Sequence, residues 1–208
     1  MPYDPLPYLV PAQCGLLLFE CQDEVIGENA EFAGLRADVV QRHMVENLSR
    51  LLEAARAAGV FVAYCNMAFR PDGLGVPKTP RYDQKPLQPV SGPAEVSPIV
   101  PPLEPLDHEL VIDRIHGMAA FHATPLELAL RDRGVTTLIP TGVSVNIGIL
   151  ATTVEAIGRG FRAVIARDCV AGDPSSYAED VLRYSLRNLA YITDSQAIAE
   201  RWGAGVEA

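Results

Sequence analysis

The chain has 208 residues, of which 49% are hydrophobic and 21% are charged, and its formal net charge is −9. Its length and apolar content are those of one folded domain with a sizeable core, over residues 1–208. The acidic charge argues against nucleic acid as a partner, because phosphates favour a basic protein surface. No apolar run approaches the roughly 20 residues that span a bilayer, and the first residues lack the pattern of a signal peptide. We therefore expect a cytoplasmic protein that binds neither nucleic acid nor membrane.

The four cysteines are scattered without the spacing of a metal site, at Cys14, Cys21, Cys65 and Cys169. In a chain without an export signal, they are most simply reduced and buried thiols. The four histidines form no cluster with Asp or Glu at metal-ligand spacing either. We expect no metal ion and no other cofactor.

Short apolar runs alternate with helical patterns along the chain. Six runs are predicted strands: Cys14–Phe19, Val60–Cys65, Glu109–Asp113, Thr137–Pro140, Arg162–Arg167 and Ala190–Thr193. Strand and helix in alternation imply a mainly parallel sheet with helices on both faces. The predicted fold class is α/β, a Rossmann-like three-layer α/β/α arrangement with a sheet of about six strands.

The helices are predicted from periodicity and from capping patterns. A long helix runs from about Ala37 to Ala58, because apolar residues fall on one face at spacings of three and four: Val40, Met44, Leu48, Leu51, Leu52 and Ala55. The segment Thr124-Pro125-Leu126-Glu127 has the pattern of a capping box and begins a helix that runs to about Arg133. A helix over Ile149–Ile157 follows the fourth strand, and Ser176-Tyr177-Ala178-Glu179 is another capping box.

Ligands of open parallel sheets bind beyond the carboxyl ends of the strands. In this chain the rule selects four short segments that follow predicted strands: Glu20–Asp23, Asn66–Arg70, Arg114–Gly117 and Gly142–Gly148. We expect these segments to meet at one edge of the sheet.

Residues 71–106 are rich in proline and have little apolar periodicity. Ten of the seventeen prolines fall between Pro71 and Pro105. Such a segment is typical of an extended, largely non-helical loop. Loops this long are uncommon in compact domains and often cover an active site or contact a partner, so we expect a lid or a subunit contact. A passive surface excursion is the alternative.

The turn after the fourth strand leads into a helix whose first turn contains Gly148. Backbone N–H groups at a helix start lack partners within the helix, so they can stabilise negative charge. A glycine there costs about 1 kcal/mol of helix stability relative to alanine, which indicates either that space is needed or that helix and sheet pack tightly. Val143, Ser144 and Gly148 are therefore candidate binding residues.

The sequence Gly-Val-Ser-Val-Asn-Ile-Gly-Ile-Leu-Ala-Thr-Thr-Val-Glu-Ala-Ile-Gly-Arg-Gly-Phe, residues 142–161, resembles the signature of the isochorismatase-like cysteine hydrolases. The resemblance extends from Cys14 to about Ile198. In most members a glycine-valine pair and a threonine or serine are followed, three or four residues later, by a nucleophilic cysteine. Gly148 occupies the position of that cysteine, so the resemblance implies a divergent member that lacks the nucleophile.

Residues Leu16–Asp23 resemble the family's first motif, in which an aspartate follows the strand and a glutamine comes two residues later. Gln22 matches, and Glu20 replaces the aspartate. A carboxylate at a strand end can act as a general base, or as a general acid if burial raises its pKa. The alternative is a solvated charge, although four apolar residues directly precede Glu20.

Residues Val111–Phe121 resemble the second motif, in which a lysine follows the strand, and Arg114 stands in its place. Arginine stays charged and offers a planar fork, so the implied role is an anion clamp or electrostatic stabiliser rather than a base. A surface salt bridge is the competing interpretation. His116 has no counterpart in the family pattern; it could bind a ligand by a hydrogen bond, or it could be a structural loop residue.

Three hypotheses on function follow. The first is a hydrolase that acts on a small carboxylated metabolite by non-covalent acid chemistry, with Glu20 and Arg114 as catalytic residues. This is implied by family members that also lack the cysteine and protonate a vinyl ether; cysteine-dependent amidase activity is not expected, because Gly148 supplies no thiolate. The second is an inactive relative that binds a small acid or amide, and the third is a purely structural oligomer subunit. Family relatives are commonly dimers or larger, which implies a homo-oligomer such as a dimer or tetramer.

Overall fold

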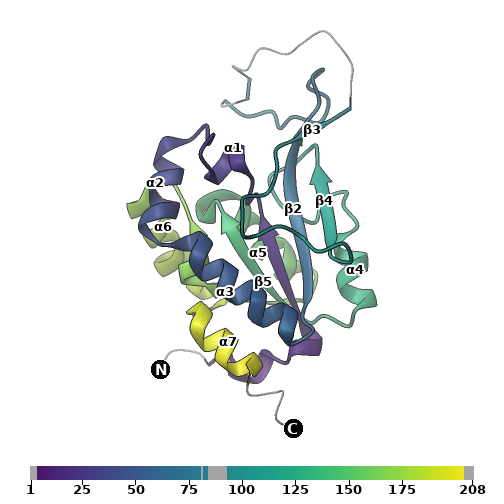
Figure 1. Cartoon of the computed structure of the whole chain (residues 1–208), viewed down its shortest axis with the longest axis vertical. Helices are drawn as coiled ribbons and strands as arrows, with labels where there is room; N and C mark the ends of the chain where they lie inside the picture. The colour runs from purple at the N-terminus through teal and green to yellow at the C-terminus, as the bar shows by residue number, and fades with distance from the viewer. Residues whose placement is uncertain (1–3, 81, 84–92, 204–208) are drawn as a thin grey trace.

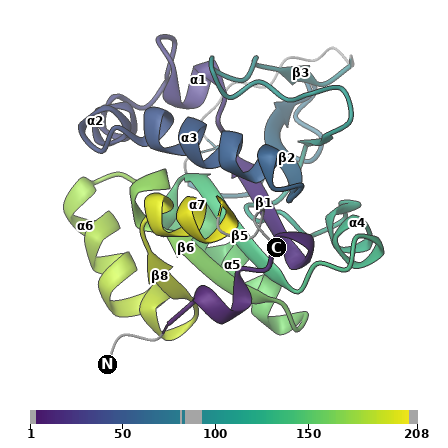
Figure 2. The ribbon, with the colours of Figure 1, turned by 60° about the horizontal axis from the view of Figure 1, so that its bottom comes forward.

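The computed structural model of the chain describes residues 4–80, 82–83 and 93–203. Eight strands in this part form one sheet, with helices on both faces (Figures 1 and 2). The strands are β1 (Cys14–Phe19), β2 (Phe61–Phe69), β3 (Glu95–Val96), β4 (Leu110–Arg114), β5 (Thr137–Val143), β6 (Arg162–Ala166), β7 (Val170–Ala171) and β8 (Tyr191–Thr193). All pairs are parallel except the short pairing of β3 with β2. The predicted three-layer fold with a mainly parallel sheet is confirmed, and the two strands beyond the expected six have two residues each.

The strand order brings the predicted edge segments together. Strand β1 lies between β2 and β5, and β4 pairs with β2. The register places Phe19, the last residue of β1, beside Cys65 and Gly142, and it places Arg114 opposite Met67. The carboxyl ends of four strands therefore meet at one edge.

The helices include short 3₁₀ and π segments. The α-helices are α1 (Asp23–Ile26), α2 (Ala33–Gln41), α3 (Met44–Ala57), α4 (Leu126–Asp132), α5 (Leu150–Gly158), α6 (Ser175–Asp180) and α7 (Ser195–Gly203). The π-helical segments are Val145–Ile149 and Val181–Ser185, and the 3₁₀ segments are Leu6–Tyr8, Pro11–Gln13, Arg167–Cys169 and Leu186–Asn188.

Alternate residues of β1 belong to two separate apolar cores, one on each face of the sheet. Leu16 and Leu18 pack into the core on the side of α3 and α7, which lie in front of the sheet in Figure 1. Leu17 and Phe19 pack into the core on the side of α4 and α5. All six residues of β1 are buried, as the continuous apolar run predicts for a strand covered on both faces. Phe19 therefore lies beneath the carboxyl edge of the sheet, on the α5 side.

The prediction of one long helix from Ala37 to Ala58 is wrong. The chain forms α2 and α3 instead, and His43 between them has a φ of 52°. The left-handed conformation at His43 turns the chain, so the apolar stripe of α3 does not continue back to Val40, which is 64% exposed. The other predicted stripe residues are buried: Met44, Leu48, Leu51, Leu52 and Ala55.

Neither predicted capping box forms. Helix α4 begins at Leu126, and the Thr124 hydroxyl donates a hydrogen bond to the Ala120 carbonyl at 2.6 Å. The Glu127 carboxylate accepts hydrogen bonds from Arg131 and Arg159 rather than reaching back to the cap. Helix α6 begins at Ser175, with Pro174 at its N-cap. Competing partners nearby in space thus override the local pattern in α4. The predicted helix over 149–157 begins as the π-helical segment Val145–Ile149 and continues as α5.

The described part of the proline-rich loop contains the short strand β3 and no helix; the prediction for residue 81 and for residues 84–92 lies outside the described residues. The loop is tied to the sheet by Gln22. Its amide nitrogen donates to the carbonyls of Met67 and Ser97 at 2.9 and 3.0 Å, and the Met67 amide donates to its side-chain oxygen at 2.7 Å. Gln22 therefore joins the ends of β1 and β2 to the loop.

The four cysteines are buried and unpaired, as predicted from their scattered positions. Among the described residues, no helix combines the length and apolar character needed to cross a membrane.

Candidate active site

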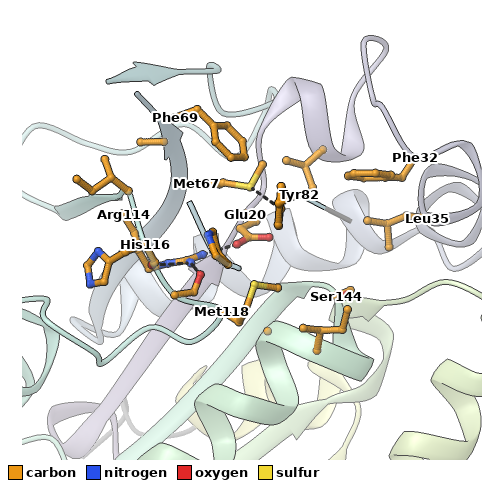
Figure 3. A pocket seen from close by; sticks show the side chains of 17 residues that line it. Glu20, Phe32, Leu35, Met67, Phe69, Tyr82, Arg114, His116, Met118 and Ser144 are labelled. Carbon is orange, nitrogen blue, oxygen red and sulfur yellow. Dashed lines mark hydrogen bonds and ion pairs between the residues drawn. The ribbon is translucent and has the colours of Figure 1, made fainter. Parts of the chain in front are cut away.

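A pocket opens at the carboxyl edge of the sheet, where all four predicted edge segments contribute residues (Figure 3). Glu20 and Arg114 lie in it, together with Ser144, Gly148 and His116. The cavity volume is about 50 Å³, which leaves room for only a few water-sized atoms. The structure thus brings together five of the six predicted site residues.

Val143 is the exception. It is the last residue of β5, it is fully buried, and it packs into the core on the α3 side of the sheet. Val143 does not line the pocket, although Val25 and Leu35 of the same core do. A binding role for Val143 stays a prediction.

Glu20 has an unusual backbone conformation for a residue other than glycine. Its φ is 52°, and its amide donates to the Cys65 carbonyl at 3.0 Å. Left-handed geometry costs a residue with a Cβ about 1–2 kcal/mol, and such conformations cluster at functional sites. The side chain is 18% exposed and forms an ion pair with Arg114. A freely solvated strand-end charge, the alternative interpretation of Glu20, does not fit this environment.

Arg114 is held on several sides. Its side chain is only 3% exposed, and one terminal nitrogen donates to the carbonyls of Gly117 and His116 at 2.6 and 3.3 Å. The other donates to Glu20, and the guanidinium carbon lies 4.8 Å from the centre of the Phe19 ring. Burial lowers the pKa of Arg114, but the Glu20 carboxylate and other partners outweigh it, so the net pKa is raised. Arg114 is a buried, permanently charged partner and not a surface salt bridge.

Gly148 is the point of closest packing between the helix start and the sheet. A Cβ at this position would lie 2.5 Å from Cε1 of Phe19, closer than real contacts allow. The glycine therefore does not leave an empty gap, as one interpretation held, because the Phe19 ring fills it. Tight packing, the alternative interpretation, is the one that the structure bears out.

The amides at the helix start are partly engaged. Those of Ile147 and Ile149 both donate to the Ser144 carbonyl at 3.1 Å. The prediction that this turn stabilises negative charge thus rests on its remaining amides.

His116 lies at the pocket and also makes structural contacts in its loop. It lines the pocket, and its carbonyl accepts a hydrogen bond from Arg114. Its ring nitrogen Nε2 lies 2.8 Å from the His122 carbonyl, and the two imidazole rings meet edge to face. These contacts fix the loop that positions Arg114.

None of the four cysteines lines the pocket. Cys21 is fully buried and its thiol donates to the Phe19 carbonyl at 3.7 Å. Burial raises the pKa of Cys21 to about 12 and the pKa of Cys14 and of Cys65 to about 11. Burial also raises the pKa of Cys169 well above its usual value. These thiols have the burial and the raised pKa values of core residues.

The walls of the pocket are largely apolar, and sequence reasoning missed several of them. Figure 3 shows Met67, Phe69 and Met118 around the Glu20–Arg114 pair, with Tyr82 beside Met67. Met67 and Phe69 fall within a predicted edge segment, and Tyr82 lies in the proline-rich loop of residues 71–106, for which we expect a lid or a subunit contact. Phe32 and Leu35, of the α2 region, fall in neither segment. No local pattern marks them, because only the folded chain brings them to the strand ends.

No group of three or more His, Cys, Asp or Glu side chains in the described ranges is arranged to hold a metal ion. The site is therefore characterised by one ion pair, a buried ring and an apolar wall.

Comparison with known sequences decides the family. Residues 14–197 match the isochorismatase domain. The chain belongs to the isochorismatase family. Among curated relatives, it is 31% identical over 143 residues to the uncharacterized isochorismatase family protein YwoC of Bacillus subtilis, covering 68% of this chain and 74% of that protein.

Two other relatives of the family are named as enzymes. The chain is 31% identical to N-carbamoylsarcosine amidase of an Arthrobacter species, covering 61% of this chain and 49% of that protein. It is 32% identical to maleamate amidohydrolase of Pseudomonas putida, covering 64% and 61%. The chain thus spans about half to three fifths of the length of these two enzymes.

Solved structures of the family share the fold. An isochorismatase family protein from Desulfovibrio vulgaris superposes with a TM-score of 0.75 at 24% identity, over 90% of this chain and 97% of that one. A cysteine hydrolase from Pseudomonas syringae gives a TM-score of 0.72 at 22% identity, over 98% and 96%.

The buried ion pair predicts the effect of removing its acidic partner. We expect Glu20→Ala to lower the free energy of unfolding by about 3 kcal/mol, because it leaves the buried Arg114 charge without its carboxylate. Urea denaturation at neutral pH measures this. Glu53→Ala, on the exposed side of α3, is the matched control and should change stability by less than about 0.5 kcal/mol. Equal effects of the two substitutions would contradict the burial argument.

Proposed function

We propose that the chain is a hydrolase of a small amide or carboxylated metabolite that works without a thiol nucleophile, with Glu20 as the proton-transfer group and Arg114 as its charge partner. The observation that carries the proposal is the occupation of the Gly148 position by the Phe19 ring, at 2.5 Å from where a Cβ would stand. With no side chain at position 148 and no cysteine lining the pocket, a covalent thioester has no attacking group.

Water is then the nucleophile. The Glu20 carboxylate takes a proton from a water molecule, whose oxygen bonds to the substrate carbonyl carbon. The tetrahedral intermediate collapses as the C–N bond breaks, and Glu20 returns the proton to the departing nitrogen. Arg114 stays charged throughout and balances the negative charge that develops beside it.

The contact with Arg114 favours this order of proton transfers. A positive charge in contact with a carboxylate favours its ionised form, so Glu20 is poised to accept a proton first. Protonation of a vinyl ether, the acid chemistry that the sequence suggested, needs Glu20 to start in the protonated form, which Arg114 opposes. The geometry therefore supports base-assisted hydrolysis better than acid-initiated cleavage.

The named relatives support an amide as the substrate class. Besides N-carbamoylsarcosine amidase and maleamate amidohydrolase, they include a ureidoacrylate amidohydrolase of Methylorubrum extorquens that is 26% identical, so each name points to an amide or a ureide as substrate. The apolar wall of Met67, Phe69 and Met118 would surround the body of such a substrate, while its polar end meets Glu20 and Arg114.

A binding protein without turnover is the second candidate. Glu20 and Arg114 close on each other within a narrow cavity, as expected if the ion pair has become a structural element. Such a protein would be stabilised by a small acid or amide and would release no product.

Turnover tests the role of Glu20. We expect ammonia release from at least one member of a panel of small amides that includes maleamate, N-carbamoylsarcosine and ureidoacrylate. Glu20→Gln should lower kcat at least 100-fold, because a neutral amide cannot accept the proton of water. Glu53→Gln is the control and should match the wild type. Undiminished turnover by the Glu20 variant would contradict the assignment, and stabilisation by these compounds without turnover would favour the binding protein.

Thiol labelling tests the absence of a reactive cysteine. With pKa values raised to about 11 or 12, Cys14, Cys21 and Cys65 stay protonated at pH 8, and only about one thiol in a thousand or fewer is ionised. We expect iodoacetamide at pH 8 to leave the folded protein unmodified for hours, and labelling to begin only as pH approaches the raised values or the chain unfolds. Intact-protein mass spectrometry measures it.

The same reagent in urea should label all four cysteines, which confirms that the reagent is competent. Rapid labelling of one thiol in the folded protein, with loss of turnover, would show that a nucleophilic cysteine exists after all.

A further inference from the structure

The Phe19 ring lies next to two residues that line the pocket, Arg114 and Gly148. On one side it faces the Arg114 guanidinium, whose carbon lies 4.8 Å from the ring centre. On the other side it fills the space next to Gly148, where a Cβ would lie 2.5, 3.1 and 3.2 Å from three of its carbons. Phe19 itself is fully buried and does not line the pocket.

We propose that Phe19 is a positioning residue: its ring, wedged between the start of helix α5 and Arg114, holds the guanidinium against Glu20. The proposal rests on the proposed function only for its effect on turnover. The claim that the Phe19 ring holds Arg114 in place does not depend on whether the protein catalyses a reaction.

The ring itself has little freedom to move. A Cβ at Gly142 would lie 2.2 Å from the Phe19 carbonyl oxygen, so β5 approaches the backbone of Phe19 very closely. Gly142 has a φ of 94°, a conformation that other residues rarely adopt. Strand β5 thus fixes the backbone beneath the ring, and Gly148 closes the space on its far side.

Arg114, by contrast, needs to be fixed from outside. A long side chain has many rotamers, and a salt bridge alone leaves several of them open. The carbonyls of His116 and Gly117 bind one end of the guanidinium and Glu20 binds the other. The Phe19 ring covers a face of the guanidinium, where a desolvated cation–π contact adds attraction without competing for its N–H groups. The Arg114 Nε–H is buried and has no hydrogen-bond partner among the described residues, so its isolation from water reports on this packing.

This arrangement couples Gly148 to Arg114 through the ring. A larger side chain at position 148 would push the ring toward the guanidinium, although it need not touch Arg114 itself. The glycine is therefore required by Phe19, and the two positions should tolerate change only together.

The test observes the Arg114 Nε–H directly by ¹H–¹⁵N NMR, with its signal assigned from its loss in Arg114→Lys. In the wild type we expect a sharp signal that exchanges slowly with water. Phe19→Leu keeps an apolar side chain but removes the ring face, and it should speed exchange of this proton at least tenfold while amides of the sheet core keep their protection. Gly148→Ala should act in the same direction, and adding it to Phe19→Leu should add little.

Phe161→Leu is the matched control. Phe161 belongs to the same core as Phe19, it is almost fully buried, and its ring also lies 4.8 Å from an arginine, the exposed Arg131. Its substitution should leave Arg114 exchange within twofold of the wild type. If Phe19→Leu fails to fold, Phe19→Met, whose longer and more flexible side chain adapts better to the space of the ring, replaces it.

The exchange and turnover measurements separate the positioning role of Phe19 from the proposed function. Unchanged exchange in Phe19→Leu, or an equal change in Phe161→Leu, overturns the proposal. Where a substrate turns over, Phe19→Leu should lower kcat about tenfold with KM within twofold; wild-type kcat overturns the positioning role while the proposed function stands. If Phe19→Leu speeds exchange of the Arg114 Nε–H but no amide is turned over, the positioning role stands and the proposed function is wrong.

Discussion

The arrangement of this site depends on keeping one positive charge, that of Arg114, in an almost dry place. A buried guanidinium is tolerated only where its charge is balanced and its N–H groups are satisfied. Glu20 supplies the balance, and the loop carbonyls of His116 and Gly117 supply acceptors. The left-handed backbone conformations of Glu20 and Gly117 are both consistent with this requirement, because each of these residues is a partner of Arg114.

The packing below that charge determines which side chain lies beside Gly148. Phe19 ends the central strand with a large ring on the α5 side, and the ring occupies the volume beside Gly148. The side chains at positions 19 and 148 therefore compete for one space, and in this chain the Phe19 ring fills it and faces Arg114. The proposed hydrolysis by a carboxylate and water, without a cysteine, rests on this packing.

Much of the fold was readable from the sequence because it follows from local rules. The apolar runs of β1 and β5 are buried on both faces, and alternation of strand and helix implies a parallel sheet. The meeting of Glu20 and Arg114 also follows, because each stands at the carboxyl end of a strand of the same parallel sheet, with only β2 between the two strands. Local patterns were enough to predict the structure where a residue's surroundings depend only on its position in its own strand.

The errors arose where distant segments decide the local structure. The turn at His43 breaks a helix that periodicity alone would continue. The sequence left two interpretations of Gly148 open, because a glycine indicates a close approach but does not show which residue approaches it. Only the folded chain shows that the neighbour is Phe19. Tyr82 lines the pocket from the proline-rich loop, and this loop has no periodic pattern from which its position could be predicted.

The central claim is hydrolysis by a carboxylate and water without a covalent enzyme intermediate. Its most direct test is the intact mass of the protein, quenched in acid within milliseconds to seconds of mixing with an amide that it cleaves. The account predicts the unmodified mass at every time point while product accumulates. An acyl adduct that maps to any cysteine, and that forms and decays at the rate of turnover, would contradict it.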